Sequence, residues 1–239
     1  MLLPPSHFDQ VCDFHVQCGV ILPATPQRDL FTTNPTLIDK AVGFIQEEYE
    51  EYLVAIANQD QKEMLDALID ISYFTLRLSA LLGTNMDLVE FDHPEWCDVI
   101  IDMVGKTCYT VIKQRLDDIQ HHVEQHDYDG LIHALYNMEV TVEKIGIQLL
   151  SHQHDKDAFR VDKWNEAFRM IHHNNMSKLC DSEDEAIKTV ASYDNHDVYK
   201  RVGYRLAPDN HHYVVFDLDT GKILKSIKWV QVDLNSFFD

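Results

Sequence analysis

Apolar residues between positions 36 and 82 recur every three or four residues, which is the spacing of an α-helix with one buried face. A polar run at 58–62 and the glycine at position 83 interrupt this pattern. We therefore predict two antiparallel helices, 36–57 and 61–82, joined by a short turn. Their apolar positions include Phe44, Ile45, Tyr52, Leu53, Ile56, Met64, Leu65, Leu68, Ile69 and Phe74.

The rest of the chain also predicts mainly helix, with an irregular arm at the start and a change of period near the end. Prolines punctuate residues 1–35, which leave room for one short helix near residues 8–18. Further helices are predicted at 94–126, 129–151 and 157–179. Alternating residues at 212–217 and an apolar and lysine-rich run at 222–229 flank a turn, so this segment predicts a small β-hairpin or an extended tail.

An internal repeat connects two of these helical regions. A shift of 67 residues lays Asp66-Ala-Leu-Ile-Asp70 over His133-Ala-Leu-Tyr-Asn137. We infer a duplicated helical hairpin, so that two hairpins form one four-helix core and the fold class is all-α. The second copy has lost most of the carboxylates of the first: Glu47, Glu48, Glu51 and Glu63 correspond to Gln114, Arg115, Asp118 and Gly130. In this arrangement Arg115 faces the acidic cluster of the first copy or a phosphate.

Six carboxylates lie among the apolar positions of the first copy: Glu47, Glu48, Glu51, Glu63, Asp66 and Asp70. At about 100° per residue, the first three share one helix face, and the last three share a face of the next helix. Carboxylates that converge beside a core need cations to stay ionised, and oxygen ligands suit Mg²⁺. The alternative is a solvated acidic face. Lys62 is the only basic residue between positions 44 and 76, so few ion pairs could relieve the repulsion on such a face.

Charge and composition narrow the class of protein. The chain has 239 residues, 45% of them hydrophobic, which is enough for one large core and at most two domains. Its net charge of −20 excludes a general binder of polymeric DNA or RNA, which needs a basic surface. A small anionic substrate is compatible with this charge, because bound metal ions and a few lysines invert the local field.

The chain has no feature of an exported or membrane-spanning protein. No run approaches the roughly 20 apolar residues that span a bilayer, and the N-terminus lacks the regions of a signal peptide. The five cysteines are odd in number and form no C-x-x-C pair, which favours reduced thiols over a disulfide framework or a zinc site. We therefore expect a cytoplasmic protein.

The acidic residues also form a recognisable motif. Glu48-Tyr-Glu-Glu51 and Glu63-Met-Leu-Asp66 match the E-x-x-E and E-x-x-D signature, with a spacer of eleven residues. Asn175-Met-Ser-Lys178 and Gly221-Lys-Ile-Leu-Lys-Ser226 follow in the expected order. With these motifs the chain resembles the all-α nucleoside triphosphate pyrophosphohydrolases, a superfamily that includes MazG, phosphoribosyl-ATP pyrophosphohydrolase and dimeric dUTPase. It is most similar to a MazG-like branch found in bacteria and phages.

The resemblance implies a single domain over 1–239 that hydrolyses a nucleoside triphosphate to a monophosphate and pyrophosphate in nucleotide-pool control. It implies Mg²⁺ as cofactor, with Mn²⁺ as a substitute, and a homodimer as a possible assembly. The implied metal ligands are Glu48, Glu51, Glu63 and Asp66, and Glu47 is the expected catalytic base. The residues expected to contact the substrate are Asp70, Asn175, Lys178 and Lys225. A deoxynucleoside triphosphate is the favoured substrate, although no motif specifies the base.

Other functions are weaker alternatives. A di-iron bundle needs two E-x-x-H pairs, which the chain does not provide, and the D-x-x-H at Asp118 and His121 is a weak substitute. A catalytically inactive helical binding protein, or a hydrolase of an alarmone or a non-nucleotide phosphate, would keep the same helices. Phe14, Tyr73 and Trp164 could stack on a base, but such residues are more typical of a core.

Overall fold

The computed structural model describes residues 5–88, 108–151, 161–194 and 196–238. The chain divides into two compact units, and the division falls within helices α1 (His7–Gln17) and α7 (Val161–Met176). The first unit comprises the described residues of 1–9, 22–168 and 234–239, and the second those of 10–21 and 169–233. The single-domain interpretation stays a prediction.

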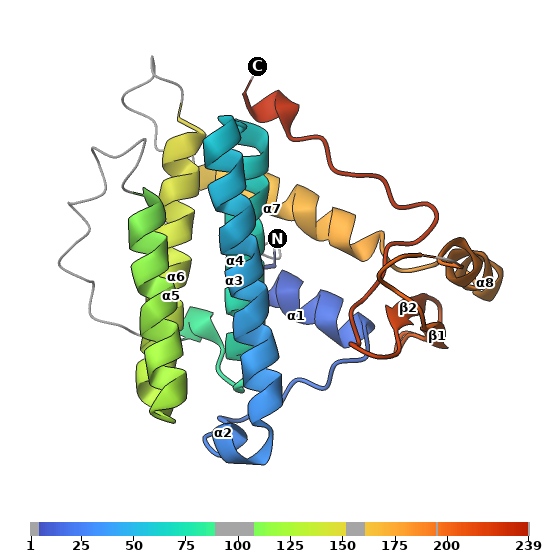
Figure 1. Cartoon of the computed structure of the whole chain (residues 1–239), viewed down its shortest axis with the longest axis horizontal. Coiled ribbons are helices and arrows are strands. Elements are labelled where there is room, and N and C mark those ends of the chain that lie inside the picture. The colour runs from blue at the N-terminus through green and yellow to red at the C-terminus, as the bar shows by residue number, and fades with distance from the viewer. Residues whose placement is uncertain (1–4, 89–107, 152–160, 195, 239) are drawn as a thin grey trace. The chain divides into compact units, whose positions relative to one another are not determined.

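Four helices form the core of the first unit: α3 (Pro35–Asn58), α4 (Gln61–Leu81), α5 (Cys108–Glu124) and α6 (Tyr128–Leu149). Helix α3 packs on α4 and α5, and α6 packs on the same two helices, so the four close into a bundle (Figure 1). Their fully buried side chains include Ile45, Leu65, Leu68, Ile69, Ile112, Leu116, Leu135 and Met138. The predicted all-α, four-helix core is confirmed. A short helix, α2 (Leu30–Thr33), and a 3-10 turn, η1 (Met86–Leu88), complete the described part of this unit outside α1, α7 and the C-terminal η4 (Asn235–Phe237).

The two hairpins turn in the same way, which supports the internal repeat. Gln59 and His126, 67 positions apart, both adopt left-handed backbone conformations with φ of 57° and 53°. The next residue caps a helix in each copy: Asp60 accepts a hydrogen bond from the N–H of Glu63, and Asp127 from that of Gly130, both at 3.1 Å. The α3–α4 pair is called the acidic hairpin below, and α5–α6 the second hairpin.

Equivalent residues of the two hairpins meet where α4 packs on α6. Ser72 donates a hydrogen bond of 2.8 Å to Oε1 of Glu139, its counterpart in the repeat. A contact between equivalent positions places them on a pseudo-two-fold axis. Oε2 of Glu139 is shielded from solvent and accepts no hydrogen bond from the described residues. Burial, together with the charges of Glu143 and Asp87, therefore raises the pKa of Glu139 to about 8, although the hydrogen bond from Ser72 opposes the shift.

The second unit combines α8 (Glu183–Ser192) with a two-stranded antiparallel sheet, β1 (Val202–Leu206) and β2 (Tyr213–Asp217). Ser182 caps α8 by accepting a hydrogen bond of 3.2 Å from the N–H of Glu185. A small core joins these elements: Cys180, Ala186, Val215 and Leu224. In the described residues, no helix has both the length and the apolar character needed to cross a membrane.

A small antiparallel sheet near the C-terminus is confirmed, as is the alternative of an extended tail, but the predicted pairing of 212–217 with 222–229 is wrong. Residues 213–217 pair with 202–206, whereas residues 222–229 form an extended tail with one isolated bridge, Phe216 to Ile223. Beyond this bridge the tail is held by a contact outside the sheet. The hydroxyl of Ser226 donates a hydrogen bond to the carbonyl of Ser177 at 3.0 Å. Helix α8 was not predicted, since ten residues with three acidic side chains in the first turn give a weak periodic signal.

Helix α7 depends on a glycine to reach the bundle core. Trp164 of α7 is fully buried, and a Cβ on Gly146 of α6 would lie 2.1 Å from its ring. We expect Gly146→Ala to lower the free energy of unfolding by about 1–3 kcal/mol, because the ring and helix must move apart. Urea unfolding measures this, with Gly43→Ala as the control, since a Cβ at Gly43 meets nothing within 4 Å. The control should be neutral or up to about 1 kcal/mol more stable; equal losses in both variants would contradict the close contact.

The Glu139 carboxyl should make stability depend on pH. Its pKa in the folded protein, about 8, lies above that of an unfolded chain, so the folded state keeps the proton longer. The contribution of protonated Glu139 to the free energy of unfolding is fully present below the pKa that this group has in the unfolded chain. It is lost as the pH rises from there toward 8, at about 1.4 kcal/mol per pH unit. Glu139→Gln should therefore gain stability over the wild type as the pH rises from 5 to 7.5. A pH-independent difference in urea unfolding would show that this carboxyl ionises normally.

Candidate active site

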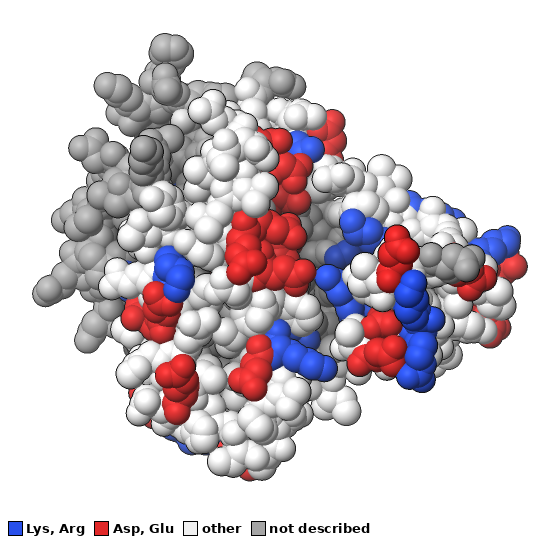
Figure 2. Space-filling view, viewed as in Figure 1, with Lys and Arg blue, Asp and Glu red and all other residues white. Residues whose placement is uncertain are grey.

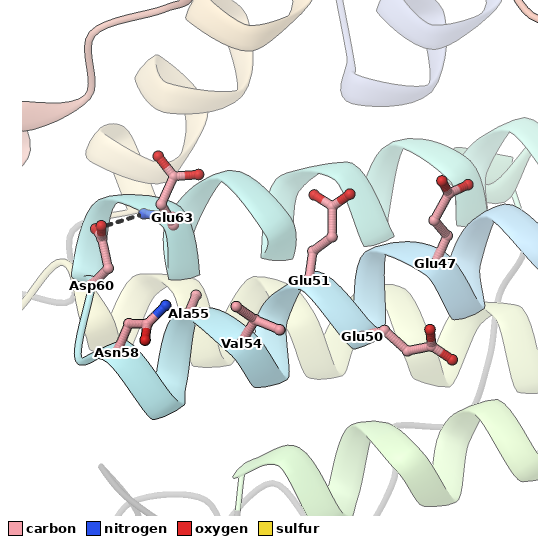
Figure 3. Close-up of a pocket in the computed structure, with 8 residues that line it drawn as sticks. All are labelled: Glu47, Glu50, Glu51, Val54, Ala55, Asn58, Asp60 and Glu63. Carbon is pink, nitrogen blue, oxygen red and sulfur yellow. Dashed lines mark hydrogen bonds between the residues drawn. The ribbon is translucent and has the colours of Figure 1, made fainter. Parts of the chain in front are cut away.

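The acidic hairpin presents its carboxylates on one surface of the first unit. Figure 2 shows acidic side chains gathered over α3. A pocket of about 350 Å³ lies on this surface, with an apolar wall from Val54 and Ala55. Figure 3 shows the carboxyl groups of Glu47, Glu51 and Glu63 extending to the same side, whereas Glu50 points away from them. The lining residues are Glu47, Glu50, Glu51, Val54, Ala55, Asn58, Asp60 and Glu63.

Glu48 lies at the centre of the charge cluster. Its side chain is half-buried, and burial is the largest cause that raises its pKa, to about 9. The next causes are the negative charges of four neighbours, in order Asp70, Glu51, Glu47 and Asp66. The structure thus brings together five of the six predicted carboxylates, from both helices. A neutral Glu48 at pH 7 is the state expected when no cation compensates these charges.

Glu63 lies at the end of the cluster. Its carboxylate pairs with Lys62 at 3.1 Å, and its own N–H is fixed by the Asp60 cap. It is not among the charges that raise the pKa of Glu48. The predicted ligand set therefore divides into three clustered residues, Glu48, Glu51 and Asp66, and one residue on the rim of the pocket.

The donor set suits a hard divalent cation. Within the described ranges, no three His, Cys, Asp or Glu side chains approach closely enough to hold a metal ion. Mutual repulsion explains this spacing, because like charges separate unless a cation draws them together. All the donors are carboxylate oxygens, the ligands that Mg²⁺ and Mn²⁺ accept, and burial together with neighbouring negative charge raises the pKa of Glu48. The residues therefore fit such an ion.

The predicted phosphate contacts lie in the second unit. Lys178 donates to Oδ1 of Asn175 at 2.6 Å, so these two residues form one polar pair. Lys225 makes a different contact: its ammonium is 3.6 Å from the centre of the Trp229 ring. That distance is typical of a cation–π interaction.

The second hairpin carries its own cation where the acidic hairpin has Glu48. Nη1 of Arg115 lies 3.4 Å from Asp118, the counterpart of Glu51. Nε of the same guanidinium donates to Thr141 at 3.4 Å. Asn137 and His133, the counterparts of Asp70 and Asp66, interact at 3.3 Å. Arg115 thus contacts its own hairpin, where it offsets the charge that survives there.

Some pocket residues were missed at the level of sequence. Val54 and Asn58 follow Glu51 at helical spacing, so the continuing face of α3 was the available signal. The three aromatic residues considered for base stacking, Phe14, Tyr73 and Trp164, are 7%, 2% and 0% exposed. They belong to the packed interior of their units.

Comparison with known proteins also points to the acidic hairpin. Residues 21–91 match the family model of phosphoribosyl-ATP pyrophosphohydrolase, and this range contains the whole acidic hairpin. An uncharacterised protein of Acanthamoeba polyphaga mimivirus is 28% identical over an alignment of 239 positions, which covers 92% of this chain and 91% of the viral protein. No solved structure matches the chain. The segment that carries the acidic hairpin is thus similar to the phosphoribosyl-ATP pyrophosphohydrolases, in line with the superfamily that the sequence motifs indicate.

Proposed function

We propose that the protein is a Mg²⁺-dependent pyrophosphohydrolase that converts a nucleoside or deoxynucleoside triphosphate to the monophosphate and pyrophosphate, in control of the nucleotide pool. One observation carries the proposal. Four carboxyl groups converge on the half-buried Glu48 within the segment that matches the pyrophosphohydrolase family. Such crowding of like charges disfavours the ionised cluster unless a cation is bound.

The metal ligands in this proposal are Glu48, Glu51, Glu63 and Asp66. The ion, Mg²⁺ or Mn²⁺, would neutralise triphosphate charge and make the attacking water more acidic. Glu48 would lose its proton on metal binding, because a nearby cation lowers the pKa of a carboxyl group. Glu63 would move its charge from Lys62 toward the ion, a small cost since a partly exposed ion pair contributes little stability.

Glu47 is the proposed base. It is exposed, lines the pocket and points to the same side as Glu51 and Glu63, so a water in the pocket is within its reach (Figure 3). Its carboxylate would orient that water and accept its proton. The negative charge of Asp70 is one of those that raise the pKa of Glu48. Asp70 would contact the sugar or act as an outer ligand. The phosphate-contacting roles of Asn175, Lys178 and Lys225 stay predictions.

The decisive experiment measures pyrophosphate release from a panel of ribonucleoside and deoxynucleoside triphosphates with Mg²⁺. We expect turnover of at least one nucleotide by the wild type, and a loss of about 100-fold or more in Glu48→Gln and in Glu63→Gln. Glu50→Gln is the matched control, because Glu50 lies on the same helix but points away from the cluster. Folded, Mg²⁺-supplied protein that turns over none of the panel would contradict the proposal and favour an inactive binding protein.

Metal binding can be measured independently of activity. An ion that binds only the folded protein raises its free energy of unfolding, by about 2.7 kcal/mol at 100 times the dissociation constant. We expect Mg²⁺ or Mn²⁺ to raise the melting temperature of the wild type and of Glu50→Gln, and chelation to reverse the rise. Asp66→Asn should lose most of this response. A response to the ion that is equal in all three proteins would place the ion elsewhere.

A further inference from the structure

The pocket on the acidic hairpin has an end that lies away from Glu47. Val54 and Ala55 form an apolar wall there, and Asn58 and Asp60 lie beside it (Figure 3). Within the described part of the chain, Asp60 accepts a hydrogen bond at one oxygen only: Oδ1 receives the capping bond from the N–H of Glu63. The other oxygen, Oδ2, is an acceptor at the edge of the wall. We call Val54, Ala55, Asn58 and Asp60 the wall end of the pocket.

In the second hairpin a heteroaromatic ring occupies the equivalent place. His122 is the counterpart of Ala55, and its Nδ1 lies 2.9 Å from Oδ2 of Asp127. A carboxylate only accepts hydrogen bonds, so the imidazole is the donor. Asp127 is the counterpart of Asp60 and caps its helix with its other oxygen, Oδ1. The repeat thus shows what this place accepts: a flat ring that donates an N–H to the second oxygen of the capping aspartate.

In the acidic hairpin the same place is open. Ala55 has a methyl group where the second hairpin has the imidazole of His122, and it lines the pocket of about 350 Å³. The two places differ in one respect: a Cβ at Gly130 would lie 2.2 Å from Nδ1 of His122, and Glu63 has such a Cβ. A ring bound in the acidic hairpin must therefore lie farther out in the pocket, where the wall includes the exposed Val54.

The length of the pocket suits a nucleotide. Asn58 follows Glu51 by seven residues on α3, which is about 10.5 Å at 1.5 Å per residue. This is close to the length of a nucleotide from its phosphate to the far edge of its base. With the phosphates at Glu47 and Glu51, the base of the same molecule reaches the wall end.

We propose that the wall end binds the nucleobase of the substrate, and that this base carries an exocyclic amino group that donates to Oδ2 of Asp60. The inference rests on the proposed pyrophosphohydrolase function. A carboxylate favours the amino group of cytosine, adenine or guanine and repels a carbonyl in its place. The Asn58 amide, which has both a donor and an acceptor, can pair with the ring nitrogen beside the amino group. The substrate class is therefore a triphosphate of an amino-bearing base, in contrast to uracil, thymine and hypoxanthine.

The test compares kcat/KM for two pairs of nucleotides, dCTP with dUTP and dATP with dITP. Each pair exchanges one amino group for a carbonyl and keeps the size of the base. Deoxyribose 5-triphosphate, which has no base, measures the triphosphate chemistry alone. We expect the amino member of each pair to be favoured about 10- to 100-fold, as for one hydrogen bond to a charged group.

Two matched variants locate the source of this preference. Asp60→Asn replaces the acceptor Oδ2 by an amide donor and keeps an oxygen for the cap, because Asn caps helices as well as Asp does. The preference for the amino member should fall at least about tenfold or reverse, while turnover of the baseless triphosphate changes less than about threefold. Asp127→Asn makes the same change at the cap of the second hairpin and should leave all five values unchanged.

The outcomes separate this inference from the function on which it rests. If the wild type hydrolyses none of the five compounds, nor any nucleotide of the larger panel, the pyrophosphohydrolase proposal fails. If the wild type is active but lacks the amino preference in either pair, or if Asp60→Asn keeps the wild-type ratio, the assignment of the wall end is overturned. An equal loss for all five compounds in Asp60→Asn would also overturn it, because Asp60 would then act on folding or on the metal site. A melting curve for each variant identifies an effect on folding.

Discussion

Repulsion among carboxylates on the acidic hairpin is the constraint on which the site depends. Glu48 cannot be ionised cheaply, because it is half-buried and lies beside four other carboxyl groups, and its pKa of about 9 expresses both costs. Helices α3 and α4 nonetheless hold these groups together, because their opposite faces are fixed in the bundle by fully buried residues such as Ile45 and Leu68. Burial of apolar surface in the bundle thus maintains a charge arrangement that would separate in an isolated hairpin.

The second hairpin shows the same backbone without this constraint. It turns through the same left-handed residue and the same aspartate cap, yet Arg115 supplies a permanent positive charge where Glu48 stands in the acidic hairpin. The two hairpins therefore separate two tasks that one bundle must perform. The acidic hairpin concentrates unbalanced charge, and the second supports it with a network that is balanced internally.

Much of the first unit could be predicted from local patterns. The helices predicted at 36–57 and 61–82 extend over 35–58 and 61–81, because periodicity, the Asp60 cap and Gly83 act within a few residues of one another. The clustering of Glu48 with Asp66 and Asp70 followed from the same periodicity. Features that depend on partners distant in the sequence could not be predicted in this way. The strand at 202–206 and the contact of Lys225 with Trp229 each require the folded second unit.

The contact between Ser72 and Glu139 has a consequence for how such a chain can assemble. Because equivalent positions meet at the pseudo-two-fold axis, each hairpin occupies the place that a second copy of the other would take. A protein with the acidic hairpin alone could complete the same bundle by pairing with an identical chain, serine facing serine, and would carry two acidic faces. Joining the hairpins in one chain removes that symmetry requirement. The partner half is then free to diverge, as its replacement of serine by glutamate at the axis illustrates, while the bundle no longer depends on protein concentration to form.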